Sequence, residues 1–298
     1  MESNYCRERS FILIIADNWK DYEILDANDS EKLERWGDII LRRPDPQIIW
    51  NKSIDENLWN SAHARYLRNN KGGGFWKIYK NLPESWEIKY GNLKFSIHPT
   101  GFKHTGLFPE QAVNWDWISK KIKSSTKDVK VLNLFAYTGA ASCAASNAGA
   151  SEVVHVDAAK GMVRWAKENS ILSGLENNRF RFLTDDVFKF IEKEIRRGNK
   201  YDAIIMDPPS YGRGPKGEIW KIENKFNELL QRIKKILTDD FLFVLINCYT
   251  TGFSNIALEN IVKIEFSDMN RNIYSGQTLL PITSGDLYLP CGIYCRVE

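Results

Sequence analysis

The chain has 298 residues, 43% of them hydrophobic, which is enough for one large domain or two smaller ones with a buried core. Its 41 Lys and Arg residues nearly balance 38 Asp and Glu residues, so net charge neither requires nor excludes a nucleic-acid partner. The five cysteines form no C-x-x-C pair, which argues against a zinc site or a disulfide framework. We therefore expect no bound metal. No apolar run is long enough for a signal peptide or a membrane-spanning helix, so we expect a cytoplasmic protein.

Residues 1–118 are rich in tryptophan and predict a smaller β-rich domain. The segments FILII and DIILRR have the apolar, β-branched composition of short strands. WEIKY and LKFSI are joined by Gly91 and Asn92, a pair that is typical of a tight turn, so we expect a β-hairpin there.

A basic and aromatic segment, residues 57–83, contains no Asp or Glu. Its cations could contact a phosphate backbone while its aromatic rings stack on bases. The candidate residues for docking RNA are Arg65, Arg68, Lys71, Trp76 and Lys77. A loop around three consecutive glycines, flanked by half-buried aromatic side chains, accounts for the same composition, and the sequence leaves both interpretations open.

From Val129 onward, short apolar runs alternate with longer helical segments, as in a parallel sheet covered by helices on both faces. We predict a doubly wound α/β domain over residues 119–298, with a mostly parallel seven-stranded sheet. The expected strands are VKVLNLF (129–135), EVVHVD (152–157), RFRFLTD (179–185), YDAIIMD (201–207), DFLFVLINC (240–248), VKIEFSD (262–268) and GIYCRVE (292–298).

In such a sheet, ligands bind beyond the carboxyl ends of the strands, so the residues that follow each strand are the candidates. Thr138 and Gly139 predict a tight turn that opens a helix after the first strand. Asp157 ends the second strand, where a carboxylate can accept hydrogen bonds from ribose hydroxyls. Asp186, after the third strand, could accept one from an adenine amino group. Each acid could equally be a helix cap.

The fourth strand ends in MDPPSYGRG (206–214), which is the most specific motif in the chain. Pro208 and Pro209 fix the backbone and remove two amide donors, so that their carbonyls can face a planar substrate. Asp207 lies at the edge of the sheet beside the expected ligand. We therefore predict catalytic roles for Asp207, Pro208 and Pro209, although a purely structural turn would have the same sequence.

Taken together, LNLFAYTGAAS, VVHVDAAKGMVRWAKEN, TDDVF and MDPPSYGRG resemble the class I S-adenosylmethionine (SAM)-dependent methyltransferases, in the branch that includes 23S ribosomal RNA 5-methylcytosine methyltransferases. The resemblance covers residues 128–298, and GFKHTGLFPEQ (101–111) is similar to an element that precedes the SAM domain in that branch. It implies a Rossmann-like fold, SAM as cofactor and an RNA substrate. The cofactor-binding residues it implies, together with the strand ends, are Thr105, Gly106, Phe108, Gln111, Asn133, Phe135, Tyr137, Thr138, Gly139, Asp157, Ala158, Asp185, Asp186, Val187 and Asp207.

In the cytosine enzymes of that branch, a cysteine after the fifth strand attacks C6 of the base, and Cys248 is the candidate here. An alignment shifted by one residue places Tyr249 there instead, and a cysteine at a strand end is also commonly a small buried hydrophobe. Two other functions stay open: methylation of a nitrogen on RNA, DNA or protein, and binding of SAM or RNA without catalysis. The glycine spacing of dinucleotide-binding enzymes is missing. The sequence does not determine the oligomeric state.

Overall fold

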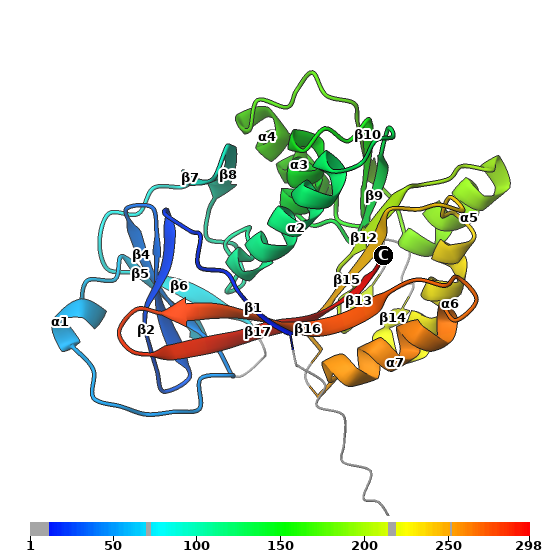
Figure 1. The fold of residues 1–298 in the computed structure, drawn as a ribbon. Coiled ribbons are helices and arrows are strands. Elements are labelled where there is room, and N and C mark those ends of the chain that lie inside the picture. The colour runs from blue at the N-terminus through cyan, green and yellow to red at the C-terminus, as the bar shows by residue number, and fades with distance from the viewer. Residues whose placement is uncertain (1–11, 70–72, 214–218, 251) are drawn as a thin grey trace, which may run out of the picture.

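The computed structural model describes residues 12–69, 73–213, 219–250 and 252–298, and most of its strands join one continuous sheet (Figure 1). In spatial order the strands are β11-β10-β9-β12-β15-β17-β16-β2-β3-β4-β5-β6, and β1 pairs with β16. Within these ranges, no helix is long and apolar enough to cross a membrane. The same ranges contain no cluster of His, Cys, Asp and Glu that could hold a metal ion.

The C-terminal half supplies seven strands of this sheet and confirms the predicted doubly wound fold. Neighbours β11 to β15 pair in parallel, whereas β17 runs antiparallel to both of its neighbours. Leu134, Val156 and Met206 are level in the register, so β9, β10 and β12 end at one edge of the sheet. The strands are β9 (Lys130–Leu134), β10 (Glu152–Asp157), β11 (Phe180–Thr184), β12 (Ala203–Met206), β15 (Phe243–Cys248), β16 (Ile273–Ile282) and β17 (Leu287–Val297).

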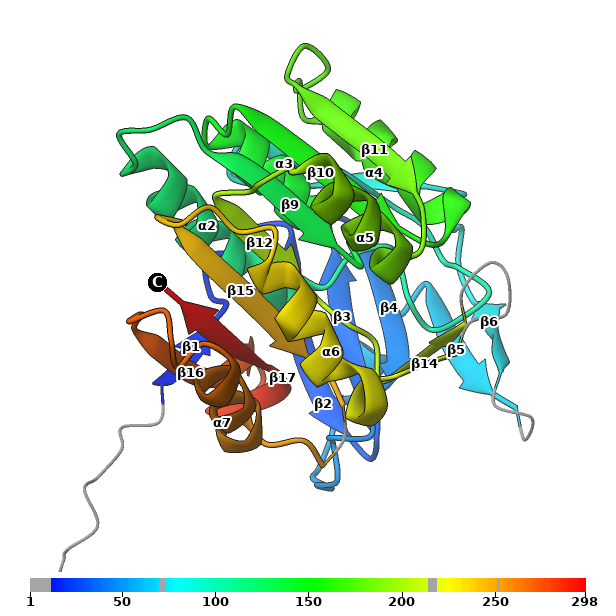
Figure 2. The ribbon, with the colours of Figure 1, turned by 90° about the vertical axis from the view of Figure 1, so that its right-hand side faces the viewer.

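Helices cover both faces of this part of the sheet (Figures 1 and 2). Successive residues of a strand point to opposite faces. Val131 of β9 therefore packs in a cluster with Ile118 and Ala145 on one face, and Leu132 packs with Ile191 on the other. The helices are α2 (Ala112–Lys123), α3 (Ala140–Asn147) and α4 (Lys160–Leu172) on the first face, and α5 (Val187–Arg197), α6 (Ile222–Lys234) and α7 (Asn255–Glu265) on the second.

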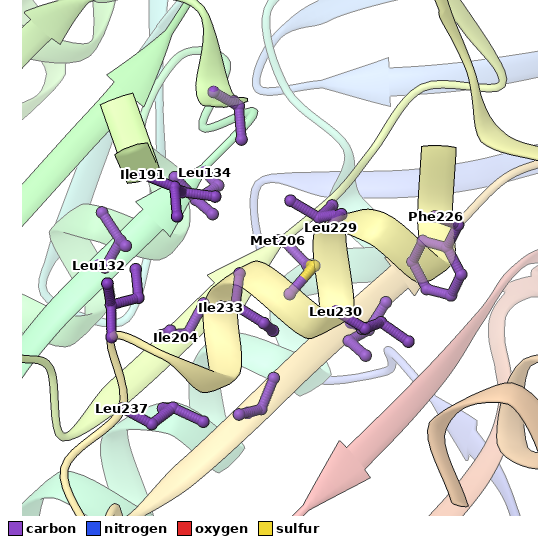
Figure 3. Packing of buried hydrophobic residues seen from close by; sticks show 14 of the residues in the cluster. Leu132, Leu134, Ile191, Ile204, Met206, Phe226, Leu229, Leu230, Ile233 and Leu237 are labelled. Atoms are coloured by element: carbon purple, nitrogen blue, oxygen red, sulfur yellow. The ribbon is translucent and has the colours of Figure 1, made fainter. Parts of the chain in front are cut away.

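Apolar contacts between α6 and the sheet form a large part of the core. Figure 3 shows Leu229, Leu230 and Ile233 of α6 lying against strand side chains such as Ile204 and Met206, all of them fully buried. Burying one such side chain contributes about 2 kcal/mol, so these contacts hold α6 firmly against β12 in the interior of the sheet.

One predicted strand is wrong. Residues 262–265 form the last turn of α7, and the strand that closes the sheet is β16, which begins at Ile273. Ser254 caps α7, because its hydroxyl accepts a hydrogen bond from the backbone amide of Ala257 at 3.1 Å. Leu258 and Val262 then recur at helical spacing and pack into the core. The buried residues Leu258, Val262 and Phe266 thus recur every four positions, as in a helix. Within 262–268 alone, the apolar residues also alternate as in a strand, which is why a strand was predicted.

The N-terminal half is built of short strands, as predicted, but they extend the same sheet. Ile24 of β2 pairs with Ile282 of β16, and β2, β3 and β4 form an antiparallel meander. Helix α2 runs from Ala112 to Lys123 and therefore continues through the predicted domain boundary at 118/119. That boundary stays a prediction. The elements are β1 (Ile12–Ile15), β2 (Tyr22–Asn28), β3 (Glu31–Trp36), β4 (Ile39–Pro44), α1 (Glu56–Trp59), β5 (Ala64–Arg68) and β6 (Gly74–Ile78).

Two hairpins lie outside the main sheet. The first joins β7 (Trp86–Tyr90) to β8 (Leu93–Ile97), and Gly91 in its turn has φ of 55°, which confirms the predicted hairpin. The second joins β13 (Tyr211–Arg213) to β14 (Ile219–Lys221), directly after the DPPS sequence. A single 3₁₀ turn, η1 (Pro109–Gln111), leads from the segment after β8 into α2. These connections bring residues 98–111 to the carboxyl edge of the sheet.

Candidate active site

The turn after β9 has an unusual backbone. Phe135 and Tyr137 have φ values of 52° and 50°, and Gly139, the N-cap of α3, has φ of 84°. Left-handed conformations are costly for residues with a side chain and recur at ligand-binding sites. The prediction of a tight turn that opens a helix at Gly139 is therefore confirmed. The strain lies at the point where the sheet's strand order reverses.

A cavity lies against this turn, and we call it the inner cavity. It is lined by side chains from the turn, from residues 107–115, and from the ends of β9, β12 and β15. Of the residues predicted from sequence to bind a cofactor, it brings together Phe108, Gln111, Asn133, Phe135, Tyr137, Thr138, Gly139 and Asp207. Asn247, near the end of β15, also lines this cavity and was not predicted.

A chain of buried amide groups forms one wall of the inner cavity. Asn114 donates hydrogen bonds of 2.9 Å to the side-chain oxygens of Gln111 and Asn247, and Arg296 donates one of 2.7 Å to Asn114. Gln111 in turn donates to the hydroxyl of Tyr249. Since these hydrogen bonds are buried, the chain fixes the positions of Gln111 and Asn247 at the cavity, although Nε of Arg296 is buried without a hydrogen-bond partner among the described residues. Only Gln111 was predicted from the sequence.

Thr105 and Gly106 support the inner cavity from behind and do not line it. The carbonyl of Gly106 accepts a hydrogen bond of 2.5 Å from the hydroxyl of Thr138. Gly106 has φ of 100°, and a Cβ there would lie 2.1 Å from the ring of Trp165. Glycine is therefore required by both the backbone and the packing. The hydroxyl of Thr105 is buried without a hydrogen-bond partner among the described residues.

Asp157 holds the backbone around the turn. Its carboxylate accepts hydrogen bonds from the amides of Tyr137 at 2.9 Å and Ala159 at 2.8 Å. Burial raises the pKa of Asp157, and these two backbone bonds lower it in part. Each carboxylate oxygen keeps a second lone pair, so the cap role does not prevent ligand binding. Asp157 and Ala158 are half-buried and line none of the cavities described here.

Of the two acids after β11, Asp186 lines a second cavity, the side cavity, of about 300 Å³, and Asp185 does not. Asp186 caps α5 by accepting from the amide of Lys189 at 3.0 Å, and Asp185 pairs with Lys193 at 2.6 Å. Asp186 and Val187 line the side cavity, and Phe135 lines both this cavity and the inner one. The predicted helix cap thus exists, and it leaves Asp186 at a cavity wall.

A third cavity of about 410 Å³, the outer cavity, opens over the DPPS sequence. Asp207, Pro208 and Pro209 line it, and Asp207, Leu107 and Phe108 line the inner cavity as well. Burial, with a smaller contribution from the charge of Glu110, raises the pKa of Asp207 to about 7. The carbonyl of Pro209 accepts a hydrogen bond from the indole of Trp220. Asp207 therefore stands between two cavities and can exchange a proton near neutral pH.

Cys248 is only 1% exposed and packs in the apolar core with the α7 side chains. It lines neither the inner nor the outer cavity. The side chains of Tyr249 and Cys291 line the outer cavity instead. Burial raises the pKa of the thiols of Cys248 and Cys291, and it does so strongly for Cys291. Cys291 was not predicted as a site residue, because its position at the cavity depends on the pairing of β16 with β17.

The basic and aromatic segment forms β5, β6 and the residues around them. Arg68 and Lys77 are exposed, as are Phe75 and Tyr79. Arg65 instead forms an ion pair with Glu31 at 2.8 Å. The half-buried indole of Trp76 donates to the carbonyl of Thr100 at 2.9 Å, and Lys71 lies outside the described residues.

Comparison with known proteins decides the family. A family model described as S-adenosylmethionine-dependent methyltransferase matches residues 60–267. The chain belongs to this family. A SAM-dependent methyltransferase from Agrobacterium tumefaciens has a crystal structure with a TM-score of 0.93 to this chain, at 32% identity over 97% of this chain and 94% of that one. A putative methyltransferase from Streptococcus mutans, at 18% identity and a TM-score of 0.72 over 95% of this chain and 76% of that one, shares the fold.

Two curated relatives of this methyltransferase are named for ribosomal RNA. Ribosomal RNA large subunit methyltransferase K of Neisseria meningitidis serogroup B is 27% identical over 76% of this chain and 64% of the relative. Ribosomal RNA large subunit methyltransferase K/L of Shewanella frigidimarina is 34% identical over 54% of this chain. The matched part is 22% of the length of that relative, so this methyltransferase corresponds to only a part of it.

Proposed function

We propose that this methyltransferase transfers the methyl group of SAM to a base of large-subunit ribosomal RNA. One observation carries the proposal: Asp207, Leu107 and Phe108 line both the inner and the outer cavity, so ligands in the two cavities would meet at these side chains. The names of the relatives from N. meningitidis and S. frigidimarina support large-subunit RNA as the substrate.

The chemistry of the residues around the inner and side cavities fits SAM. The carboxylate of Asp207 and the amides of Asn133 and Asn247 suit the charged amino-acid end of the cofactor. Asp157 contacts the turn that borders the inner cavity, and its remaining lone pairs suit ribose hydroxyls. Asp186 lines the side cavity beside Val187 and Phe188 and suits adenine. When bound, the cofactor supplies a methyl group already activated on a sulfonium.

Catalysis by the chain itself then consists mainly of orientation. Pro208 and Pro209 offer a rigid surface for a planar base at the floor of the outer cavity, and the ring of Phe108 borders the same space. Asp207 lies beside both and can accept a proton from a nitrogen of the base, because its pKa is raised to about 7. A water-poor junction between the two cavities would hold donor and acceptor in line.

Between the two target atoms that the sequence leaves open, we favour a nitrogen. Attack on C6 of cytosine requires a thiolate that reaches the base. Cys248 is buried in the core, and Cys291, which lines the outer cavity, has a strongly raised pKa and so stays a thiol at neutral pH. A nitrogen needs no covalent intermediate with the protein. The cytosine mechanism remains the alternative, and substitution of Cys248 tests it.

RNA docking on the segment around β5 and β6 is a further part of the proposal. The exposed cations Arg68 and Lys77 lie near the exposed rings of Phe75 and Tyr79, and Lys77 is 5.4 Å from the ring centroid of Tyr79. Cations beside exposed aromatic rings suit a single-stranded or looped RNA. Arg65 and Trp76 have structural partners and would position this surface rather than bind RNA themselves.

The direct test is to incubate the purified protein with methyl-labelled SAM and separate fractions of unmodified RNA, DNA and protein. We expect label in large-subunit ribosomal RNA, on a base nitrogen identified by mass spectrometry of the digested nucleosides. Label in 5-methylcytosine would support the cysteine mechanism, and label in DNA or protein would reject the RNA substrate. Binding of SAM without transfer to any fraction would favour a non-catalytic binding module.

A further inference from the structure

Besides Asp207, Pro208 and Pro209, the outer cavity is lined by three cations, Lys32, Arg43 and Lys103, which we call its cationic end. Two more acids, Asp45 and Glu110, also line the cavity. The cations come from β3, from β4 and from the segment that follows β8, so three separate parts of the chain place positive charge at this cavity. The volume of about 410 Å³ is within the range of small-ligand sites.

Two of the three cations are already neutralised. Arg43 donates to both carboxylate oxygens of Glu34, at 2.5 and 2.8 Å, inside the wall of the cavity. Lys32 lies 3.5 Å from Glu34 and 3.3 Å from Asp45. Two carboxylates, Glu34 and Asp45, therefore pair with Arg43 and Lys32. The third acid at the cavity, Glu110, has a pKa that burial raises, and it forms no ion pair within 4.0 Å among the described residues.

Lys103 is the third cation. Its ammonium donates a hydrogen bond of 3.4 Å to the carbonyl of Pro44, and no carboxylate lies within 4.0 Å of it among the described residues. Burial lowers the pKa of Lys103, and the nearby charges of Lys32, Arg43 and Arg68 lower it further, whereas Asp45 raises it. A half-buried ammonium among like charges is unfavourable unless an anion binds there.

The backbone holds Lys103 firmly at this place. Its carbonyl accepts a hydrogen bond of 2.9 Å from Arg43, so the ion pair of Arg43 with Glu34 also fixes the segment that carries Lys103. The indole of Trp76 in β6 bonds to Thr100 in the same segment. This hydrogen bond thus ties β6 to the segment that carries Lys103.

We propose that the cationic end of the outer cavity is a phosphate site, in which Lys103, assisted by Lys32, binds a phosphate of the nucleotide whose base lies over Pro208 and Pro209. This inference deepens the proposed function and depends on it for the identity of the nucleotide as part of an RNA. The phosphate would supply the negative charge that Lys103 lacks. The ammonium in return would fix the distance of the base from Asp207.

The test measures binding of the four nucleoside 5′-monophosphates and the four nucleosides to the full chain, with S-adenosylhomocysteine present. We expect at least one monophosphate to bind about tenfold more tightly than its nucleoside, because of one charge-assisted contact. Lys103→Gln should abolish that advantage and leave the affinity for the nucleoside unchanged. Lys103→Arg should retain most of it. Lys167→Gln, on the exposed face of α4, is the matched control and should behave as the wild type.

Equal affinity of the wild-type protein for monophosphates and nucleosides, or no binding of any monophosphate, would overturn the phosphate site. An undiminished advantage in Lys103→Gln would do the same. Labelled-methyl transfer to ribosomal RNA is measured in parallel. Monophosphate binding without transfer would keep the phosphate site and reject the proposed function. Binding of ribosomal RNA is also measured as a function of salt concentration. For Lys103→Gln, the slope of log affinity against log salt concentration should be shallower by about one than for Lys167→Gln, as expected for the loss of one phosphate contact.

Discussion

The inner and outer cavities share Asp207, Leu107 and Phe108, but the chain builds their other walls in different ways. The inner cavity depends mainly on one turn, residues 135–141, whose strained backbone is held by Asp157 and by the parallel register of β9, β10 and β12. The outer cavity gathers residues from β3, β4, β17 and η1, from the connections after β4, β8 and β12, and from Tyr249 after β15. A buried ion pair, Glu34 with Arg43, holds part of this wall together. Local backbone geometry thus sets the first cavity, and long-range packing sets the second. Substitutions should separate these two dependences.

The ion pair of Glu34 with Arg43 should give the largest effect. Glu34→Gln leaves Arg43 buried without its carboxylate, and we expect the free energy of unfolding to fall by about 3 kcal/mol or more. The matched control is Glu23→Gln, which removes a half-exposed ion pair with Arg35 and should cost under about 1 kcal/mol. Denaturant unfolding of the two variants measures the difference, and equal losses would contradict a special role for the buried pair.

The same ion pair predicts a dependence of stability on pH. Burial alone would raise the pKa of Glu34, but the charges of Arg43 and Lys32 and the hydrogen bonds from Arg43 and Tyr22 lower it to about 2. A carboxylate with a lowered pKa stabilises the fold above its ordinary value of 4.5, and this stability is lost as the pH falls toward 2. Between these pH values the wild-type protein should lose more stability than Glu34→Gln does.

Asp207, at the junction of the two cavities, should come next. Asp207→Asn is expected to lower kcat for methyl transfer by about 100-fold, because the amide cannot accept the proton or balance a positive charge. Burial and Glu110 raise the pKa of Asp207 to about 7, so the active carboxylate forms as the pH rises through that value. The wild-type rate should rise over about one pH unit on each side of it, and the rate of Asp207→Asn should stay flat. Asp240→Asn, at an exposed position, is the control.

Asp157 tests the local construction of the inner cavity. Asp157→Ala removes the acceptor for the amide of Tyr137 and the proposed partner of the ribose, so affinity for SAM should fall about tenfold. Calorimetric titration measures this, and Asp157→Asn, which keeps one acceptor oxygen, should lose less. Unchanged affinity in Asp157→Ala would remove Asp157 from the cofactor site. We expect Asp157→Ala to leave the stability of the N-terminal strands against denaturant unchanged.

The difference between the cavities also explains what the sequence could predict. Strand ends are fixed by short apolar runs and by the residues that follow them, so Gly139, Asp157 and Asp186 could be found at the sheet edge from spacing alone. The continuation of the sheet through β2 could not be predicted from the sequence, because one pair of residues, Ile24 with Ile282, joins elements far apart in the chain. For the same reason Asn247, Cys291 and Lys103 were missed. The strand predicted over residues 262–268 was wrong because, over so few positions, the apolar residues fit the period of a strand as well as that of a helix.

Cys248 should give the smallest effect on activity, and this makes it the sharpest test of the target atom. The side chain is 1% exposed and packs in the core, and burial raises the pKa of its thiol. Cys248→Ala removes one buried sulfur, and we expect about 1 kcal/mol lower stability with kcat changed less than about twofold.

Cys291→Ala is the companion variant, since that thiol faces the outer cavity and the first does not. If the target is a nitrogen, neither variant should abolish transfer, and KM for RNA alone should shift in Cys291→Ala because the cavity wall changes. Loss of transfer in Cys248→Ala, with stability retained, would mean that the core opens to expose the thiol and that a covalent cytosine adduct forms. Loss of transfer in Cys291→Ala alone would instead assign that attack to β17. The first result would keep the reacting group at a strand end, where the sequence places it, and only the second would move it to the wall of the outer cavity that long-range pairing builds.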